Sequence, residues 1–481
     1  MPNKLEQFKV PLLQKNNIPE VIEKLLGKKI FNVQIERLAL DCRRKGNPHF
    51  VCNATFNTEI APIATSEILL KKYKKNNEMP NDVSIVGAGP AGLWAAYGLL
   101  LKGHKVNLYE QGKPIEERFR DIRRFLKGGI FLEHSNIFFG EGGAGAFSDG
   151  KLNTRNRTEF SQAVLGDLIK LGAPEEIAYL AKPHIGTDRL QFLIKNMRKQ
   201  ILELGGKIHF ESCLQDISVT ENRLNSICIN KKWQPCEVLV LASGHSARNI
   251  YAMLSAHGAQ LEGKSFAIGA RIEHPQSFIN ESRFGKGVDY KLTGAADYTL
   301  TGKTAYSFCM CPGGIVVPCA SEPNGVVTNG MSYSRRNSPF ANSALIVPCH
   351  IEKDDIKSGI ALQRQLENAA FEMAGKNFSV PKQSAESFLS KKSCLWDLMP
   401  KHISHALEAA LYEFEKKMPG FIKNGTLIAP ETRTSSPIRI VRKENGESVS
   451  ISGIYPVGEG AGYAGGILTS AADGVRLAYV I

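Results

Sequence analysis

The sequence predicts an α/β fold in which a doubly wound sheet carries an inserted β-rich α+β domain and follows a small N-terminal α+β domain. Three observations indicate this. Apolar strands alternate with helices over residues 82–268, as they do in a doubly wound sheet. Two glycine-rich turns, at residues 87–92 and 458–467, each follow an apolar strand and begin a helix. Between them, residues 269–440 are rich in β-like runs and turn residues.

The first element is the small N-terminal unit. Apolar residues at helical spacing predict a helix over 18–26, and a second helix is expected over 60–73. Alternating apolar residues predict strands over 7–13, 30–42 and 50–56. This β-α-β-β order is typical of a ferredoxin-like or RNA-recognition-like module. The strands lack the paired aromatic residues of a single-strand binder, so docking or oligomerisation is the default role.

The domain boundaries follow from changes in composition. Residues 1–75 form the small domain, and the hydrophilic run at 74–81 is the expected linker. Residues 82–268 form the first part of the nucleotide-binding domain, and 441–481 return to it as strand, turn and helix. The inserted segment, 269–440, is predicted to bind substrate. There is no internal repeat and no second strand-linked glycine triplet.

The first glycine-rich turn has the spacing of a dinucleotide site. The apolar run at residues 83–86 leads into Gly87, Gly89 and Gly92, and a second apolar run ends on Glu110. Gly87 permits the tight turn, Gly89 lets the backbone approach a pyrophosphate, and Gly92 lets helix and strand pack closely. The pyrophosphate then lies at the positive end of the helix dipole. Glu110 can accept hydrogen bonds from a ribose diol. This order is typical of a Rossmann-like domain.

Bulk properties exclude several other classes. The 481 residues are 43% hydrophobic, enough for two or three domains with their own cores. No apolar stretch approaches the ~20 residues that cross a bilayer, and the start lacks the apolar core of a signal peptide. The ten irregularly spaced cysteines favour reduced thiols in a cytoplasm. Neither paired CxxC motifs nor HExxH occurs, so no metal site is expected.

The formal net charge of +13 leaves two interpretations open. One is a solvated surface that also attracts an anionic cofactor. The other is binding of RNA or another polyanion. Part of the charge lies in the Lys-Asn-rich run at residues 71–77, but the rest is spread along the chain, which favours the first interpretation.

The second glycine-rich turn indicates which dinucleotide is bound. An apolar strand ends at Gly458 and Glu459, and a helix expected over residues 468–479 begins after Gly465, Gly466 and Ile467. The acid can accept from ribityl hydroxyls. The helix N-terminus can point its N–H groups at the pyrimidine edge of a flavin and stabilise the negative charge of the reduced ring. The two turns together predict FAD.

Nine motifs in combination resemble a known family. They are GAGPAG (87–92), GEGGAGAFSDGKLNT (140–154), KPHIGTDRL (182–190), LASGHSAR (241–248), GARIEHPQ (269–276), SFCMCPGG (307–314), NGMSYSRR (329–336), ETRTSSPIRI (431–440) and GEGAGYAGGI (458–467). The chain resembles the FAD-dependent dehydrogenases without assigned substrate, within the glutathione-reductase/p-hydroxybenzoate-hydroxylase-like flavoprotein class. The motifs cover nearly everything from residue 82 onward and say less about the N-terminal unit.

The resemblance implies an extended FAD. Leu214 would flank the adenine, Gly244 would cap the nucleotide, and Glu459 replaces the Asp usual in many flavoproteins with a longer reach. The resemblance does not supply the substrate. The residues expected at the cofactor are Gly87, Ala88, Gly89, Pro90, Ala91, Gly92, Glu110, Gly142, Gly143, Ser148, Lys151, Leu214, Ser243, Gly244, Gly458, Glu459, Gly465, Gly466 and Ile467.

Cys309 and Cys311 are the first candidates for chemistry. They stand two positions apart before a Pro-Gly-Gly turn, and side chains at i and i+2 of a strand share a face. They can therefore present two thiols to the flavin, as a redox pair or as a nucleophile and its partner. The alternative is that they are buried and only pack.

Arg271, Glu273 and His274 form the second candidate group. One interpretation is anion binding by Arg271 and proton transfer by His274. The other is an Arg271–Glu273 pair at a domain hinge with His274 hydrogen-bonded in place.

Three further polar groups have weaker support. We expect His184, Asp188 and Arg189 to order a loop, and Arg335 and Arg336 either to bind a substrate anion or to be solvated. His402 and His405 lie at helical spacing but lack a third ligand, which argues against a metal.

The sequence therefore predicts a cytoplasmic FAD-dependent oxidoreductase that transfers a hydride between the flavin and a small-molecule substrate. Without a second Rossmann module, NAD(P)H is expected only as a transient visitor. A FAD-dependent tRNA- or RNA-modifying enzyme and a flavin-binding sensor without turnover stay open as alternatives. The sequence does not indicate the oligomeric state.

Overall fold

The computed structural model describes residues 3–71, 80–154, 157–391 and 394–481, so most of the expected linker and of the Lys-Asn-rich run lies outside the described residues. At the N-terminus, a three-stranded antiparallel sheet has the order β1-β3-β2. Helix α1 covers one face of it, and its apolar residues pack against Val10, Leu38 and Phe50. These elements are β1 (Lys4–Val10), the 3-10 turn η1 (Leu12–Gln14), α1 (Ile18–Leu26), β2 (Gln34–Asp41) and β3 (His49–Thr55).

Helix α1 has the predicted bounds, but the first strand lies three residues earlier than expected. It ends at Val10 because Pro11, which has no N–H to donate, begins the 3-10 turn. The helix expected over 60–73 is also shorter. It is α2 (Ser66–Leu70), and it packs on α5 (Glu159–Lys170) instead of on the small sheet. Among residues 3–71 the structure therefore shows three strands and one covering helix of a ferredoxin-like arrangement.

A five-stranded parallel sheet forms the second unit, with the order β20-β10-β4-β5-β6. Strand β20 comes from the C-terminal segment, so this segment returns to the parallel sheet. The α/β fold with a Rossmann-like sheet is confirmed. The strands are β4 (Asp82–Val86), β5 (Lys105–Tyr109), β6 (Lys207–His209), β10 (Leu239–Leu241) and β20 (Ile454–Pro456).

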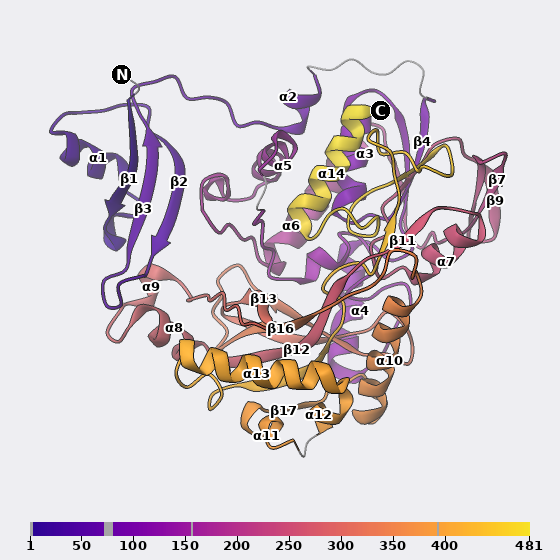
Figure 1. The fold of residues 1–481 in the computed structure, drawn as a ribbon. Coiled ribbons are helices and arrows are strands. Elements are labelled where there is room, and N and C mark those ends of the chain that lie inside the picture. The colour runs from indigo at the N-terminus through magenta and orange to yellow at the C-terminus, as the bar shows by residue number, and fades with distance from the viewer. Residues whose placement is uncertain (1–2, 72–79, 155–156, 392–393) are drawn as a thin grey trace.

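The two faces of the parallel sheet are covered differently. Alternate residues such as Ile85 and Val240 pack against helices, among them α3 and α14, which lie side by side (Figure 1). Residues of the other alternation, such as Val86 and Leu241, pack against α7 and the antiparallel meander β7-β8-β9. The covering elements are α3 (Pro90–Leu101), α4 (Ile115–Gly128), the 3-10 turns η2 (Ala144–Phe147) and η3 (Glu175–Ala178), α6 (Thr187–Glu203), β7 (Leu214–Thr220), β8 (Arg223–Ile229), β9 (Lys232–Pro235), α7 (Arg248–Ala256) and α14 (Ile467–Val480).

The third unit is built on a five-stranded antiparallel sheet of order β13-β16-β12-β18-β17, with a separate hairpin, β14-β15. Helices cover one side of the sheet and complete a second core (Figure 1). These elements are β12 (Phe266–Pro275), α8 (Gln276–Phe284), α9 (Tyr290–Thr293), β13 (Tyr306–Cys311), β14 (Gly314–Cys319), β15 (Val327–Ser332), β16 (Phe340–Cys349), α10 (Ser358–Met373), β17 (Lys382–Ser384), α11 (Ala385–Leu389), α12 (Cys394–Leu398), α13 (Lys401–Lys417) and β18 (Thr426–Glu431).

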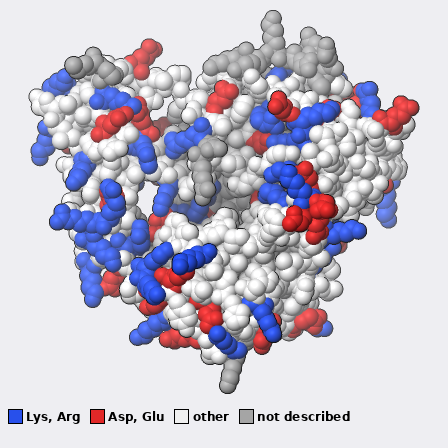
Figure 2. All heavy atoms as spheres, in the orientation of Figure 1, with Lys and Arg blue, Asp and Glu red and all other residues white. Residues whose placement is uncertain are grey.

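The chain enters and leaves the inserted unit beside one pair of short strands. Strand β11 (Leu261–Gly263), just before the insertion, pairs with β19 (Ile438–Ile440), just after it. The chain therefore leaves and re-enters through a two-stranded base, and the antiparallel sheet is held next to the ends of the parallel strands. No described helix is both long and apolar enough to span a bilayer. Figure 2 shows Lys and Arg spread over one face of the molecule, with Asp and Glu among them.

Asp167 on α5 fixes the end of the N-terminal segment to the second unit. It accepts hydrogen bonds from the Ser66 amide (2.9 Å) and the Trp94 indole N–H (3.0 Å), and from the Ser66 hydroxyl. Burial raises the pKa of Asp167 to about 6. At pH 8 this carboxylate is therefore ionised and serves as a buried acceptor for all three donors.

We expect Asp167→Ala to lower the free energy of unfolding by about 3 kcal/mol at pH 8, because buried donors lose their acceptor. Urea unfolding followed by tryptophan fluorescence measures the change. The control is Asp354→Ala at an exposed position, which is expected to change stability by less than about 0.5 kcal/mol. Equal unfolding midpoints for the two variants would contradict this role of Asp167.

Candidate functional site

A cavity of about 490 Å³ lies between the parallel sheet and the inserted sheet. Both glycine-rich turns line it, as do the first strand of the meander and residues of β12, β13, β15 and β18. Ligands of open parallel sheets bind at this position, outside the carboxyl ends of the strands. The predicted site residues that line it are Gly87, Gly89, Pro90, Ala91, Glu110, Gly143, Ser148, Lys151, Leu214, Ser243, Gly244, Arg271, Cys309, Glu459, Gly465, Gly466 and Ile467.

The three glycines of the first turn have distinct surroundings. Gly87 has φ +102°, and a Cβ there would lie 2.3 Å from the Ala242 carbonyl oxygen. A Cβ on Gly92 would lie 1.8 Å from the Gly87 oxygen, so helix and strand pack without space for a side chain. At Gly89 the nearest atom to such a Cβ is 3.8 Å away, on Gly143. The space beside Gly89 therefore belongs to the cavity, at the N-terminus of α3.

Glu110 joins three backbone segments at one end of the cavity. Its carboxylate accepts from the amides of Ala88 (2.8 Å), Gly112 (2.9 Å) and Gly140 (3.0 Å). Each carboxylate oxygen has two acceptor positions, so the group retains capacity for a ligand hydroxyl. The sequence predicted only the ribose contact, and the structure adds that Glu110 ties the first glycine-rich turn to the backbone at Gly112 and Gly140.

Arg118 on α4 positions the loop that leads to Gly140, and the sequence analysis missed it. The side chain is fully buried and donates to the carbonyl oxygens of Asn136 (2.8 Å), Ile137 (2.9 Å) and Glu141 (2.6 Å). Burial lowers the pKa of Arg118 to about 9, so it is still charged at neutral pH. Its place on the apolar face of α4, between Ile115 and Ile122, was the signal that could have identified it.

The second turn is also fixed by an acid that the sequence analysis missed. Asp473 on α14 accepts from the Gly458 amide (2.8 Å) and pairs with Arg442 (2.8 Å). Gly458, at φ +76°, packs against Ala91, where a Cβ would come within 2.7 Å. The turn is thereby held against the start of α3, and the N-terminus of α14 at Gly466 opens on the cavity.

Two buried polar atoms of the cavity wall have no hydrogen-bond partner among the described residues. They are Nε2 of His245 and the hydroxyl oxygen of Ser246. Burial lowers the pKa of His245 to about 3, so its ring is neutral, and burial raises the pKa of the nearby Glu459 to about 7. Because buried polar groups are ordinarily paired, these atoms fit a polar ligand with donors and acceptors. The open space at Gly89 fits its phosphates.

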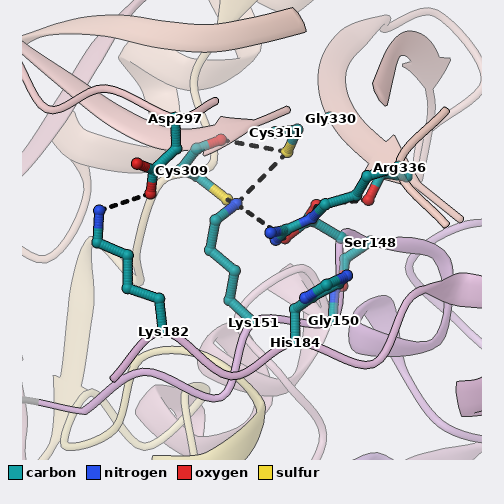
Figure 3. Close-up of polar contacts among 12 residues, drawn as sticks. Ser148, Gly150, Lys151, Lys182, His184, Asp297, Cys309, Cys311, Gly330 and Arg336 are labelled. Atoms are coloured by element: carbon teal, nitrogen blue, oxygen red, sulfur yellow. Dashed lines mark hydrogen bonds and ion pairs between the residues drawn. The ribbon is translucent and has the colours of Figure 1, made fainter. Parts of the chain in front are cut away.

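The far end of the cavity carries Cys309 and a group of charged side chains (Figure 3). Lys151 Nζ lies 3.8 Å from Cys309 Sγ and 3.6 Å from Cys311 Sγ. Lys151 also pairs with Asp149 (3.2 Å), which accepts from Arg336. A bulge in β13 between Phe308 and Cys311, with Cys309 at φ +45°, lets both thiols reach one ammonium group. The sequence predicted that the two cysteine side chains point the same way, but it did not predict the bulge.

Arg271 lines the same end, but not with the expected partner. Its guanidinium donates to Glu431 (2.8 Å) and Asn342 (2.8 Å), whereas Glu273 does not take part. Glu431 outweighs the effect of burial and raises the pKa of Arg271 above its ordinary value, so the group stays charged.

The structure does not bring His274 to the cavity. It lies on the opposite face of β12 from Arg271, and its Nε2–H donates to the Phe421 carbonyl oxygen (2.8 Å). The ring packs against Phe421, with centroids 4.3 Å apart, and burial lowers the pKa of His274 to about 4. The prediction of proton transfer by His274 at this site is therefore wrong, because its alternation along the strand directs it into the helical core.

Four predicted cofactor residues and one cysteine lie just behind the cavity wall. Gly142 packs on Ile194, where a Cβ would come within 2.4 Å, and its amide donates to the Ala88 carbonyl (2.8 Å). The five residues, which shape the wall through backbone contacts, are Ala88, Gly92, Gly142, Gly458 and Cys311.

The remaining candidates are structural or exposed. Asp188 accepts two hydrogen bonds from Ser334, both of 2.7 Å, and His184 also bonds to Ser334, which agrees with loop ordering. Arg336 is occupied by Asp149, and Arg189 and Arg335 are exposed. The described residues contain no group of three metal-ligating side chains, and His402 and His405 are exposed on α13.

Comparison with known proteins identifies the cofactor. Residues 265–395 match the family model of the C-terminal domain of FAD-dependent proteins. A Clostridium beijerinckii protein, described as uncharacterized, is 42% identical over 82% of this chain and 79% of its own. FAD is therefore the cofactor, and because a flavin carries redox chemistry, the protein is a FAD-dependent oxidoreductase.

Solved structures were also compared. CtdE in complex with FAD and a substrate is 14% identical, with a TM-score of 0.35, over 83% of this chain and 78% of its own. Glycine oxidase from Bacillus cereus ATCC 14579 is 13% identical, with a TM-score of 0.34, over 83% of this chain and 94% of its own. Similarity at this level does not bear on the reaction or the substrate.

We expect Gly89→Val to keep the fold and weaken FAD binding at least tenfold, because the new side chain occupies the space beside the α3 N-terminus. Titration of FAD followed by flavin fluorescence measures the dissociation constant, and circular dichroism checks the fold. Gly128→Val is the matched control, since Gly128 is exposed at the end of α4 with open space around it. FAD affinity equal to that of the control would contradict the placement of the phosphates.

Proposed function

Because the chain belongs to the same family as the Clostridium beijerinckii protein and carries the C-terminal domain of FAD-dependent proteins, we propose that it transfers a hydride between bound FAD and a small molecule. One observation carries the proposal. A single cavity extends from Glu110 and Leu214, beside the first glycine turn, to Arg271 and Cys309 of the inserted sheet. In this proposal the cofactor occupies the cavity beside the glycine-rich turns, and the substrate meets it at the end formed by the inserted sheet.

In this proposal the chain holds an extended FAD by its two helix N-termini. The start of α3 beside Gly89 faces the pyrophosphate, and the start of α14 faces the flavin ring. Glu110 and Leu214 contact the adenosine end, and Glu459 contacts the ribityl chain. The residues that close over the cofactor are Gly143, Ser148, Lys151, Ser243 and Gly244.

The charges at the far end support reduction of the cofactor there. FAD, when bound, supplies two-electron hydride chemistry. Arg271 and Lys151 are both cations at neutral pH, and both line this end. Together with the α14 N-terminus they stabilise negative charge in a partly enclosed site, where such interactions are stronger than in water. The inserted sheet also contributes Phe308, Thr328 and Asn329 to the space for substrate.

The source of electrons is external in this proposal. The described residues form one parallel sheet, and the GAGPAG turn follows one of its strands. The described part of the chain therefore holds one nucleotide-binding sheet. NADH or NADPH would therefore visit the flavin end transiently, or the substrate itself would be the donor.

The test is anaerobic mixing of the FAD-loaded protein with NADH, NADPH and a panel of small organic donors, monitored by flavin absorbance. At least one donor is expected to bleach the visible band, and an added acceptor is expected to restore it. A flavin that no donor bleaches would favour a binding or sensing role and would overturn the proposal.

We further expect Arg271→Lys to slow reduction of the bound flavin by its donor about tenfold or more. Lysine keeps the charge but loses the planar guanidinium that holds Glu431 and Asn342. Stopped-flow rates measure the effect, with FAD content and circular dichroism as checks on folding. Arg335→Lys, at an exposed position of the same inserted unit, is the control. If both variants are reduced at the wild-type rate, Arg271 has no role at the flavin.

A further inference from the structure

We propose that Cys309 and Cys311 form a redox pair that reacts with small disulfides, with Cys309 as the attacking thiolate and Cys311 as the resolving thiol. This inference rests on the proposed function for its supply of electrons. It assigns a substrate class, the small-molecule disulfide, to the far end of the same cavity.

The two thiols differ in access. Cys309 is half-buried and lines the cavity, whereas Cys311 is fully buried immediately behind it. The Cys311 thiol donates to the Cys309 carbonyl oxygen (3.3 Å), and both sulfurs lie close to the same Lys151 ammonium group. A ligand in the cavity therefore meets Cys309 first, and Cys311 is in position to attack from behind.

The surroundings of Cys309 are those of a reactive thiol. Lys151 Nζ lies within 3.8 Å of both sulfurs, and the Arg271 guanidinium contacts the Cys309 carbonyl (3.5 Å). Reactive cysteines lie in such electropositive, partly accessible places. The charged and titratable groups that influence this thiol are Lys151, Arg271, Cys311, Asp149, Glu431 and Glu459.

The pKa directions agree with the geometry. The hydrogen bond from Cys311, followed by Lys151 and Arg271, holds the pKa of Cys309 well below its ordinary value, against burial and Asp149. The same hydrogen bond and burial raise the pKa of Cys311. Burial also raises the pKa of other described cysteines, namely Cys52, Cys213, Cys236, Cys319 and Cys349. Cys309 is thus set apart from ordinary core cysteines.

The backbone at Cys309 is also exceptional. Its φ of +45° lies in the left-handed region, which residues other than glycine rarely adopt, and it stands in the β13 bulge. Strained residues and bulges cluster at functional sites, where they redirect a side chain. Here the bulge brings both sulfurs to one ammonium group.

The chemistry balances without any further oxidant. The Cys309 thiolate attacks one sulfur of a disulfide RSSR, forms a mixed disulfide and releases RS⁻, which takes up a proton. The Cys311 thiol then loses its proton and attacks Cys309 Sγ, which forms the Cys309–Cys311 disulfide and releases the second RS⁻. Returning the pair to two thiols takes two electrons and two protons, the equivalents that the cofactor carries in the proposed function.

The test uses glutathione disulfide as the probe, with the FAD-loaded protein and mass spectrometry of its peptides. The Cys311→Ser variant is expected to retain one glutathione on Cys309, because no resolving thiol is left. The wild type is expected to form the Cys309–Cys311 disulfide and release two glutathione thiols per protein. Cys394→Ser, which removes an exposed cysteine elsewhere, is expected to behave as the wild type. If Cys309 reacts no faster than Cys394, the proposal is overturned.

A second measurement probes the role of Lys151. The rate of iodoacetamide alkylation of Cys309 is followed against pH, since only the thiolate reacts. In Lys151→Met we expect the midpoint of the rate–pH profile, which reports the pKa of Cys309, to rise by about one pH unit. Alkylation at pH 7 then slows about tenfold. Lys182→Met, which removes an exposed lysine paired with Asp297 (Figure 3), is the matched control. Coincident profiles for the two variants would overturn the assigned role of Lys151.

These outcomes are distinct from those of the proposed function. A flavin that is reduced by a donor while Cys309 is inert to glutathione disulfide overturns the thiol pair and leaves hydride transfer intact. If Cys309 reacts with glutathione disulfide but no donor reduces the flavin, hydride transfer is overturned and the reactivity of the thiol pair stands. Circular dichroism and FAD content of each variant separate both cases from misfolding.

Discussion

Helices α3 and α14 approach so closely that even a methyl group does not fit at two positions, Gly98 and Gly474. A Cβ on Gly474 of α14 would lie 2.3 Å from the Ala91 carbonyl oxygen, and one on Gly98 of α3 would lie 2.6 Å from Ala478 Cβ. This contact joins segments nearly 380 positions apart in the sequence and sets the two glycine-rich turns next to each other. Both helix N-termini therefore open on one cavity, and a single extended cofactor can use both dipoles.

A pair of short strands sets where the inserted sheet begins and ends. The insertion leaves and returns through the β11-β19 pair, so its position relative to the parallel sheet is set at one base. Bridging side chains then fix it further. Arg248 on α7 pairs with Glu322 (2.7 Å) and Glu367 (3.1 Å) of the insertion, and all three are partly or fully buried. The far wall of the cavity, with Arg271 and Cys309, is thereby held opposite the glycine turns.

Local patterns in the sequence predicted the elements, and long-range pairs decided the details. The bounds of α1 and the return of the C-terminal segment to the first sheet follow from apolar periodicity and glycine spacing. Arg271 has its carboxylate partner 160 positions away in Glu431, which no local pattern indicates. The docking of α2 on α5 depends on Asp167, 101 positions from Ser66.

Strand alternation gave information that the sequence analysis did not fully use. In β12, Arg271 and His274 are an odd number of positions apart, so a regular strand directs them to opposite faces. Only one of the two interpretations places both residues at one site, and the other, with His274 hydrogen-bonded in place, agrees with its bond to the Phe421 carbonyl. In β13, by contrast, alternation alone is not enough. The spacing of Cys309 and Cys311 does not reveal the bulge between Phe308 and Cys311 or the left-handed backbone of Cys309. Alternation is thus a reliable guide only where the ladder is regular.

The two ends of the cavity have opposite electrostatic character, and this gives a bound dinucleotide a direction. At the Glu110 end a carboxylate is compensated by backbone amides and offers acceptors to neutral hydroxyls. At the far end Lys151 and Arg271 stay charged beside thiol groups and carboxylates. The far end combines the cations Lys151 and Arg271 with the carboxylates of Asp149 and Glu431, so negative charge there lies beside fixed positive groups. In the proposed function the flavin ring therefore lies at the far end and the adenosine at Glu110.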